Sequence, residues 1–157
     1  MPYRRFLLLA LMTWHLVVAF SVWEAPPGPL PPVQTQGTVT YVSGGIGHEE
    51  AQTFVAALTQ YPLALEFAVK RQTHQAFIAN VHTVVSLPRG HVLLDTWSQG
   101  PFLLVKLPPG DYMVSATYGE HTLSHRVRVT SPRPVHMLFL WNTPPPNDAP
   151  AESTAKP

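Results

Sequence analysis

The stretch that decides the fold is GPFLLVKLPPGDYMVSATYGEHTLSHRVRV, which spans residues 100–129. It holds one apolar run and then two segments in which apolar and polar residues alternate: 102–107, 112–118 and 123–129. Turn-forming residues separate these segments: Pro108, Pro109 and Gly110, then Gly119 and Glu120. A period of two places alternate side chains in a core and in solvent. The stretch therefore predicts three consecutive β-strands joined by tight turns.

Similar patterns extend outward on both sides of this stretch. Further segments with strand character are 38–41, 63–69, 81–87, 91–95 and 135–141. The segment 49–60 shows a helical stripe instead, formed by Ala51, Phe54, Val55 and Leu58, and Pro62 ends it. We therefore expect one mainly β domain over residues 37–141, an antiparallel β-sandwich of about seven or eight strands with one short helix near the N-terminus.

The turn and strand that follow residue 106 carry a resemblance to a known family. The residues that match its motif are Leu107, Pro108, Gly110, Tyr112, Val114 and Ala116. Together with YVSGGIG, YPLALEFA and LFLW, they make the chain resemble the carboxypeptidase regulatory-like domains, which are transthyretin-like sandwiches related to Cna-B repeats, and small exported bacterial proteins of that type. The resemblance implies a prealbumin-like sandwich with Gly110 in a structural turn. It carries over no catalytic residue, because the peptidase activity of the namesake proteins belongs to a separate zinc domain.

The N-terminus predicts export. Arg4 and Arg5 precede an apolar run, and Ala19-Phe20-Ser21 has the small-x-small form of a cleavage site. We expect a signal peptide over residues 1–21 and a periplasmic or secreted protein. The alternative is an uncleaved N-terminal membrane anchor, since Phe6 to Trp23 reaches the lower limit of a spanning helix. Proline-rich composition predicts a linker over 22–36 and a disordered tail over 142–157.

Charge and cysteine content narrow the classes of partner. The chain has 10 basic and 9 acidic residues, and loss of Arg4 and Arg5 with the signal leaves a net charge of −1. No basic stripe for nucleic acid or polybasic membrane patch remains, and we expect no membrane span after cleavage. The chain has no cysteine, so an exported domain must rely on its hydrophobic core, which suits a bacterial periplasm.

The glycine-rich segment SGGIGHEEA, residues 43–51, has the layout of a phosphate-binding loop. Glu49 and Glu50 would occupy the first helical turn and repel a phosphate, and no Lys-Ser or Lys-Thr follows the glycines. We therefore interpret the loop as structural, with positive φ angles at Gly44, Gly45 and Gly47 that allow a tight strand-to-helix reversal.

The residues that could carry catalysis do not form a recognisable set. The chain has no HExxH, HxxE or GxSxG motif. His121 and His125 would lie roughly 13 Å apart along one strand, too far to share a metal ion. We therefore expect no catalytic residue, no metal site and no cofactor.

Three classes of function are consistent with these features. The first is a non-catalytic module that binds an envelope protein or peptide, through an open sheet edge or through the end that carries Trp97, Gln99 and Gly100. The second is a carbohydrate- or envelope-binding module, which needs exposed aromatic residues such as Trp97. The third is a small metal-dependent enzyme, which the residue inventory disfavours. The exposure of Trp97, and whether a sheet edge is bare or carries charge, would discriminate between the first two.

Overall fold

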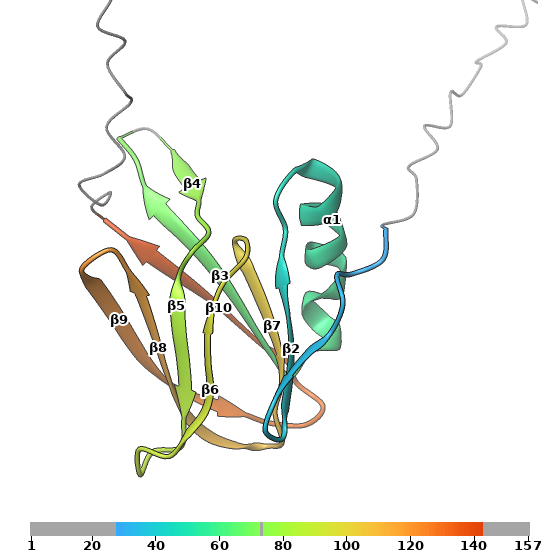
Figure 1. Ribbon diagram of the computed structural model, residues 1–157, viewed down its shortest axis with the longest axis vertical. Helices are drawn as coiled ribbons and strands as arrows, with labels where there is room; N and C mark the ends of the chain where they lie inside the picture. The colour runs from blue at the N-terminus through green and yellow to red at the C-terminus, as the bar shows by residue number, and fades with distance from the viewer. Residues whose placement is uncertain (1–27, 73, 143–157) are drawn as a thin grey trace, which may run out of the picture.

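The computed structural model describes residues 28–72 and 74–142, and Figure 1 shows their arrangement. The predicted signal peptide and nearly all of the predicted tail lie outside these residues. The described elements are, in chain order, β1 (Gln34–Gln36), β2 (Val39–Gly44), α1 (His48–Ala57), the 3-10 helix η1 (Leu58–Gln60), β3 (Leu63–Lys70), β4 (Gln75–Phe77), β5 (His82–Ser86), β6 (Val92–Trp97), β7 (Phe102–Lys106), β8 (Gly110–Tyr118), β9 (His121–Val129) and β10 (Val135–Trp141).

The strands form two sheets, and the predicted β-sandwich is confirmed. Sheet A has the order β1-β2-β7-β3-β10, and β4 also pairs with β3. Sheet B has the order β6-β5-β8-β9. A hydrophobic core lies between the sheets, and its largest fully buried side chains include Phe67, Phe139, Leu65 and Leu103. The three strands predicted from residues 100–129 are β7, β8 and β9.

One strand pair differs from the antiparallel arrangement that we expected. β10 runs parallel to β3, in a register that extends from Val135 opposite Leu63 to Trp141 opposite Val69. The backbone amide of Val135 donates to the carbonyl of Pro62, 2.9 Å away, at the start of this pair. The direction follows from the connection, because residues 130–134 carry the chain from β9 in sheet B across to sheet A.

The helix adds a third layer to the sandwich. It covers the outer face of sheet A and forms a second core there, made of Val42, Phe54, Ala57, Tyr61, Ala64, Phe102 and Leu104. Phe54 stacks on Phe102 with ring centroids 5.7 Å apart. Strand β3 is consequently buried on both faces. The alternation over 63–69 predicted one face in solvent, but Ala64 and Ala68 on that face are fully buried.

The predicted helix and linker need smaller corrections. The helical span 49–60 agrees with α1 and η1 within one residue. Val55, however, is 55% exposed, while Thr53 and Ala57 are buried, so the buried stripe is rotated from the predicted one. The predicted linker also ends early, because β1 pairs with β2 and Tyr41 donates a hydrogen bond to Oε1 of Gln34.

Candidate functional site

The glycine-rich loop is a close-packed connection between β2 and α1. Gly45 and Gly47 have φ angles of +95° and +89°, as expected, whereas Gly44 does not have a positive φ. Gly44 ends β2, where a Cβ atom would lie 2.9 Å from the ring of Phe54. Its lack of a side chain therefore makes room for the helix rather than relieving backbone strain.

A carboxylate in the first turn of α1 accepts a hydrogen bond from the backbone of the glycine-rich loop. Glu49 and Glu50 lie in the first turn, and Oε2 of Glu50 accepts a hydrogen bond from the amide of Ile46 at 2.9 Å. An amide that could face an anion therefore already has a partner, and the acidic first turn complements the helix dipole. This geometry supports the interpretation of the loop as structural.

The residues proposed as partner contacts at the end of β6 fall into two groups. Trp97 is 63% exposed and Gln99 is exposed, so both can contact a partner. Gly100 is buried, and a Cβ atom on it would lie 2.2 Å from the carbonyl oxygen of Gly44. It packs backbone against backbone and holds the loop in place, so its assignment as a contact residue is corrected.

Trp97 rests on an ordered polar support. Its ring centroid lies 4.9 Å from that of His82, and Nε2 of His82 lies 2.6 Å from Oδ1 of Asp95. The backbone amide of Asp95 donates in turn to Oε1 of Gln36, 3.0 Å away. Sequence reasoning missed His82 as part of this group, because its position beside Trp97 depends on the pairing of β5 with β6.

The histidines considered as metal ligands are separated. His125 is exposed and its ring lies edge-on to Phe139, at a centroid distance of 5.2 Å. His121 instead contributes its carbonyl oxygen, which accepts a hydrogen bond from Nε1 of Trp141 at 3.0 Å. No group of three or more His, Cys, Asp or Glu residues able to hold a metal ion occurs within residues 28–72 and 74–142.

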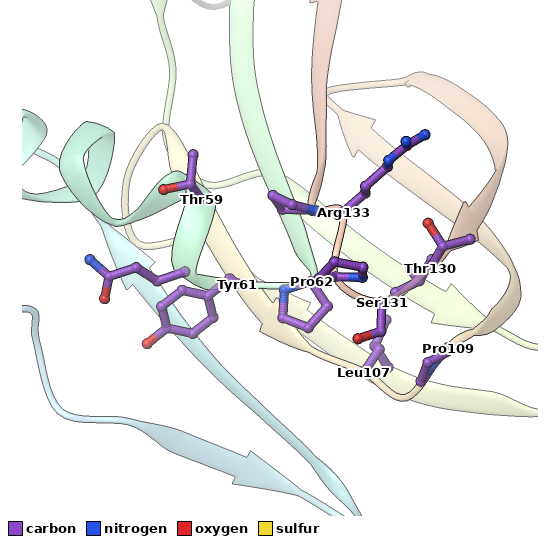
Figure 2. A pocket seen from close by; sticks show the side chains of 12 residues that line it. Thr59, Tyr61, Pro62, Leu107, Pro109, Thr130, Ser131 and Arg133 are labelled. Atoms are coloured by element: carbon purple, nitrogen blue, oxygen red, sulfur yellow. The ribbon is translucent and has the colours of Figure 1, made fainter.

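A pocket of about 220 Å³ lies at the end of the sandwich where β3 begins and the β9–β10 connection passes. Proline side chains form much of its wall, together with Tyr61, Leu107 and the hydroxyls of Thr59, Thr130 and Ser131. Figure 2 shows the side chain of Arg133 extending away from Tyr61. The pocket thus has rigid apolar walls, but its one charged side chain does not point into it.

The predicted turn at Gly110 lies beside this pocket. Gly110 begins β8, and the hydroxyl of Tyr112 donates to the carbonyl of Pro108 at 2.7 Å. Burial raises the pKa of the Tyr112 phenol above its ordinary value of 10.0. A Cβ atom on Gly110 would lie 3.3 Å from that hydroxyl, so this glycine leaves space for the hydrogen bond.

The strands at the two ends of each sheet's main strand order differ in how they are protected. β1 has only three residues. On β6, the backbone amide of Asp95 already donates a hydrogen bond to the side chain of Gln36. β9 carries Arg126 and Arg128, whose charges discourage another strand from pairing. β10 has seven residues, VHMLFLW, and its one titratable side chain, His136, pairs with Glu66 at 2.8 Å.

The side of the sandwich formed by β9 and β10, called here the seam, exposes part of the core. Six hydrophobic residues pack against the main core while remaining partly exposed, and three of them lie on the strands of the seam: Leu123, Val135 and Met137. A fourth, Tyr118 at the end of β8, lies beside the seam, with its ring 5.9 Å from that of Trp141. A cavity of about 280 Å³, called here the seam cavity, lies at one end of the seam. Its walls are formed by residues 120–123 and 140–142.

Comparison with known proteins adds no family to this description. No model of a known protein family matches the chain, and no curated protein is significantly similar to it. Within the described residues, no helix has the length and apolarity needed to cross a membrane.

Proposed function

We propose that this protein is a non-catalytic, exported binding module that pairs an extended segment of another polypeptide with the outer edge of β10. The observation that carries the proposal is a long apolar edge strand that has no strand partner on its outer side among the described residues. Exposed edges of this kind are templates for strand addition, in which main-chain hydrogen bonds supply affinity.

The geometry of β10 identifies the groups that would bind. The amide of Val135 points toward β3, and amide direction alternates along a strand. The amides and carbonyls of His136, Leu138 and Leu140 therefore point toward the outer edge. They offer three regularly spaced donors and three acceptors to an incoming strand.

The side chains on β10 favour an apolar partner. Leu138 is 43% exposed on the outer face of sheet A, although it lies mid-strand. No Lys, Arg, Asp or Glu occurs on β10, in contrast to β9, where arginines would oppose pairing. An added strand would extend sheet A and cover the half-exposed residues of the seam.

Proline substitution tests this proposal, because proline removes one amide at a chosen side of the strand. Leu138→Pro deletes an outward-pointing amide and leaves the β3–β10 ladder intact, so the fold should persist. Leu138→Ala is the matched control, since it shortens the same side chain but keeps the amide. Met137→Pro deletes an amide that points toward β3 and should destabilise the protein.

The binding assay uses a random-peptide display library panned against the folded wild-type protein, followed by synthesis of the selected peptides. We expect selected peptides to bind Leu138→Ala nearly as well as wild type and Leu138→Pro at least about tenfold more weakly. N-methylation of alternate peptide amides should also abolish binding. Equal binding to the proline and alanine variants would refute strand addition at β10.

Trp97 supports a second candidate, the carbohydrate-binding module. Its exposed indole, held by His82 and Asp95, offers a flat apolar surface bordered by hydrogen-bonding groups. The test is co-sedimentation with insoluble envelope polysaccharide. Binding that Trp97→Ala abolishes and Leu138→Pro leaves unchanged would support this function over peptide binding.

A further inference from the structure

We infer that the outer face of sheet B binds an extended, neutral glycan chain that lies across the strands, with one sugar ring stacked on Trp97. The inference deepens the carbohydrate-binding candidate, on which it rests, and is independent of strand addition at β10. The ligand class is a chain of equatorially linked pyranose units, as in β-1,4-linked glucans and chitin-type chains.

Four side chains form one row across all four strands of sheet B. In order from β6 to β9 they are Trp97, His82, Thr117 and Thr122. Directly paired residues point to the same face of a sheet, and the neighbours of His82 along β5, Val81 and Thr83, are buried, so the row lies on the outer face. With neighbouring strands about 4.8 Å apart, the row is about 14 Å long.

A second row lies beside the first on the same face. It consists of Asp95, Val84, Ser115 and Ser124. The hydroxyls of Ser115 and Ser124 lie 2.8 Å apart, and those of Thr117 and Thr122 are also 2.8 Å apart. One hydroxyl of each pair donates to the other, so each pair retains a donor and free lone pairs for a ligand. The two rows together present an aromatic ring at one end and ordered hydroxyl groups at the other.

The indole of Trp97 is arranged as a stacking surface. Its ring centroid lies 4.9 Å from that of His82, with an angle of 30° between the planes, so His82 covers one face of the indole. The side chain remains 63% exposed, which leaves the opposite face open. An open aromatic face accepts the apolar C–H side of a sugar ring while the sugar hydroxyls stay free to bond.

The charges of the two rows favour a neutral ligand. Asp95 is their one carboxylate and His82 their one base, and the two bind each other at 2.6 Å. Neither row contains Lys or Arg. The arginines of β9 lie further along the strand, where Arg128 pairs with Asp111. A polyanion would face Asp95 without a lysine or arginine in either row to balance its charge, whereas a polyhydroxyl chain finds matching donors and acceptors.

The openness and length of this face favour an extended chain. Among the described residues, the helix α1 lies against sheet A and no helix lies on the outer face of sheet B. A ligand must remain extended over about 14 Å to contact Trp97 and Thr122 together. Equatorially linked pyranoses form such straight ribbons, whereas α-1,4-linked glucose units coil.

The experiment is calorimetric titration of the purified protein with cello-oligosaccharides and chito-oligosaccharides, each from the disaccharide to the hexasaccharide. We expect affinity to rise with chain length and to level off near the tetrasaccharide. The series that binds more tightly shows whether acetamido groups contribute. Maltotetraose is the matched control, because it has the sugar units of cellotetraose in a coiled linkage, and it should bind much more weakly.

Variants at the two ends of the first row test how the chain lies. Trp97→Ala should weaken binding of every chain length about tenfold or more. The double variant Thr117→Val and Thr122→Val removes two hydroxyls but keeps β-branched side chains, so the strands should persist. It should bind the tetrasaccharide about fivefold or more weakly and the disaccharide unchanged, because the disaccharide occupies only the Trp97 end. Ser86→Ala, on β5 outside both rows, should change neither affinity.

The outcomes separate the row from the carbohydrate-binding candidate itself. If Trp97→Ala abolishes binding but the double valine variant binds every chain length like wild type, the row is refuted and a carbohydrate site at Trp97 stands. If neither series binds while the protein co-sediments with insoluble polysaccharide through Trp97, the extended-chain ligand is refuted alone. If no carbohydrate binds in either assay, both are refuted. Equal affinity for maltotetraose and cellotetraose would also overturn the inference.

Discussion

The loop between β2 and α1 provides a matched pair of substitutions in which backbone strain and steric overlap can be measured separately. Gly45 and Gly47 both have φ near +90°, a conformation that alanine adopts at a cost of about 1–3 kcal/mol. A Cβ atom on Gly47 meets nothing within 4 Å. A Cβ atom on Gly45 would lie 2.4 Å from Cδ2 of Phe102.

The difference between the two variants should equal the cost of this overlap. Phe102 is buried and packed between Phe54 and Phe77, so it cannot rotate away without disturbing the contact between helix and sheet. Overpacking of this kind costs about 1–3 kcal/mol. We expect Gly47→Ala to lower the free energy of unfolding by about 1–3 kcal/mol, from strain alone, and Gly45→Ala to lower it by about 2–6 kcal/mol, from strain and overlap together.

Urea denaturation of the two variants tests this expectation, and a double-mutant cycle identifies the cause. Phe102→Leu shortens the obstructing ring, so Gly45→Ala should cost less in that background, while the cost of Gly47→Ala should not change. Equal costs for the two glycines, or no coupling between Gly45 and Phe102, would refute the packing argument.

Three other predictions concern ionisation and processing. The hydrogen bond from Arg128, and the charge of Arg128, hold the pKa of Asp111 below its ordinary value of 3.8. The pair therefore stabilises the fold above pH 3.8, and this stability is lost as the pH falls through the lowered pKa. Urea midpoints of Asp111→Asn and wild type should differ at neutral pH and converge in strong acid. The pKa of Tyr112 is raised above the ordinary tyrosine value of 10.0, so the stability of the fold decreases as the pH rises above 10.0. This loss in alkali should be smaller in Tyr112→Phe. At neutral pH the same variant should lose about 1 kcal/mol, because it lacks the hydrogen bond to Pro108. We also predict removal of a signal peptide after Ala19-Phe20-Ser21. The mature protein should then begin at Val22, and an intact mass that retains Met1 would contradict this.

The strands that the sequence predicted best are those whose burial is set by the sandwich core. The alternation over 135–141 gives the bounds of β10, and that over 63–69 gives β3 to within one residue. The three-residue strands β1 and β4 have no such alternation and form because a longer strand offers them an edge. The burial of Ala68 was also unpredictable. Alanine occurs at both buried and exposed positions, so its place in the alternation does not indicate that a further layer covers the second face of the sheet.

The candidate sites depend on pairings between distant residues, which local patterns do not encode. The sequence placed Trp97 before a turn but left its exposure open, and both this exposure and the support by His82 depend on the register of β5 with β6. Strand β10 was predicted, whereas its edge position was not, because its neighbour β3 lies some 70 residues earlier in the chain. The seam cavity requires residues of both sheets and is therefore a property of the assembled fold.

The two sides of the sandwich are protected differently, and this difference bears on the role that we propose for the edge of β10. On the side of β1 and β6, Gln36 bonds the amide of Asp95 and Thr96 bonds the hydroxyl of Tyr41, so side chains from one sheet fasten the other. On the seam, the indole N–H of Trp141 donates to the carbonyl of His121. A bare apolar edge favours self-association, and proteins commonly protect such edges with charge, as β9 does. An edge that lacks this protection, beside a core that is already partly open, can accept a strand without first unfolding, which is the property that a strand-binding module requires.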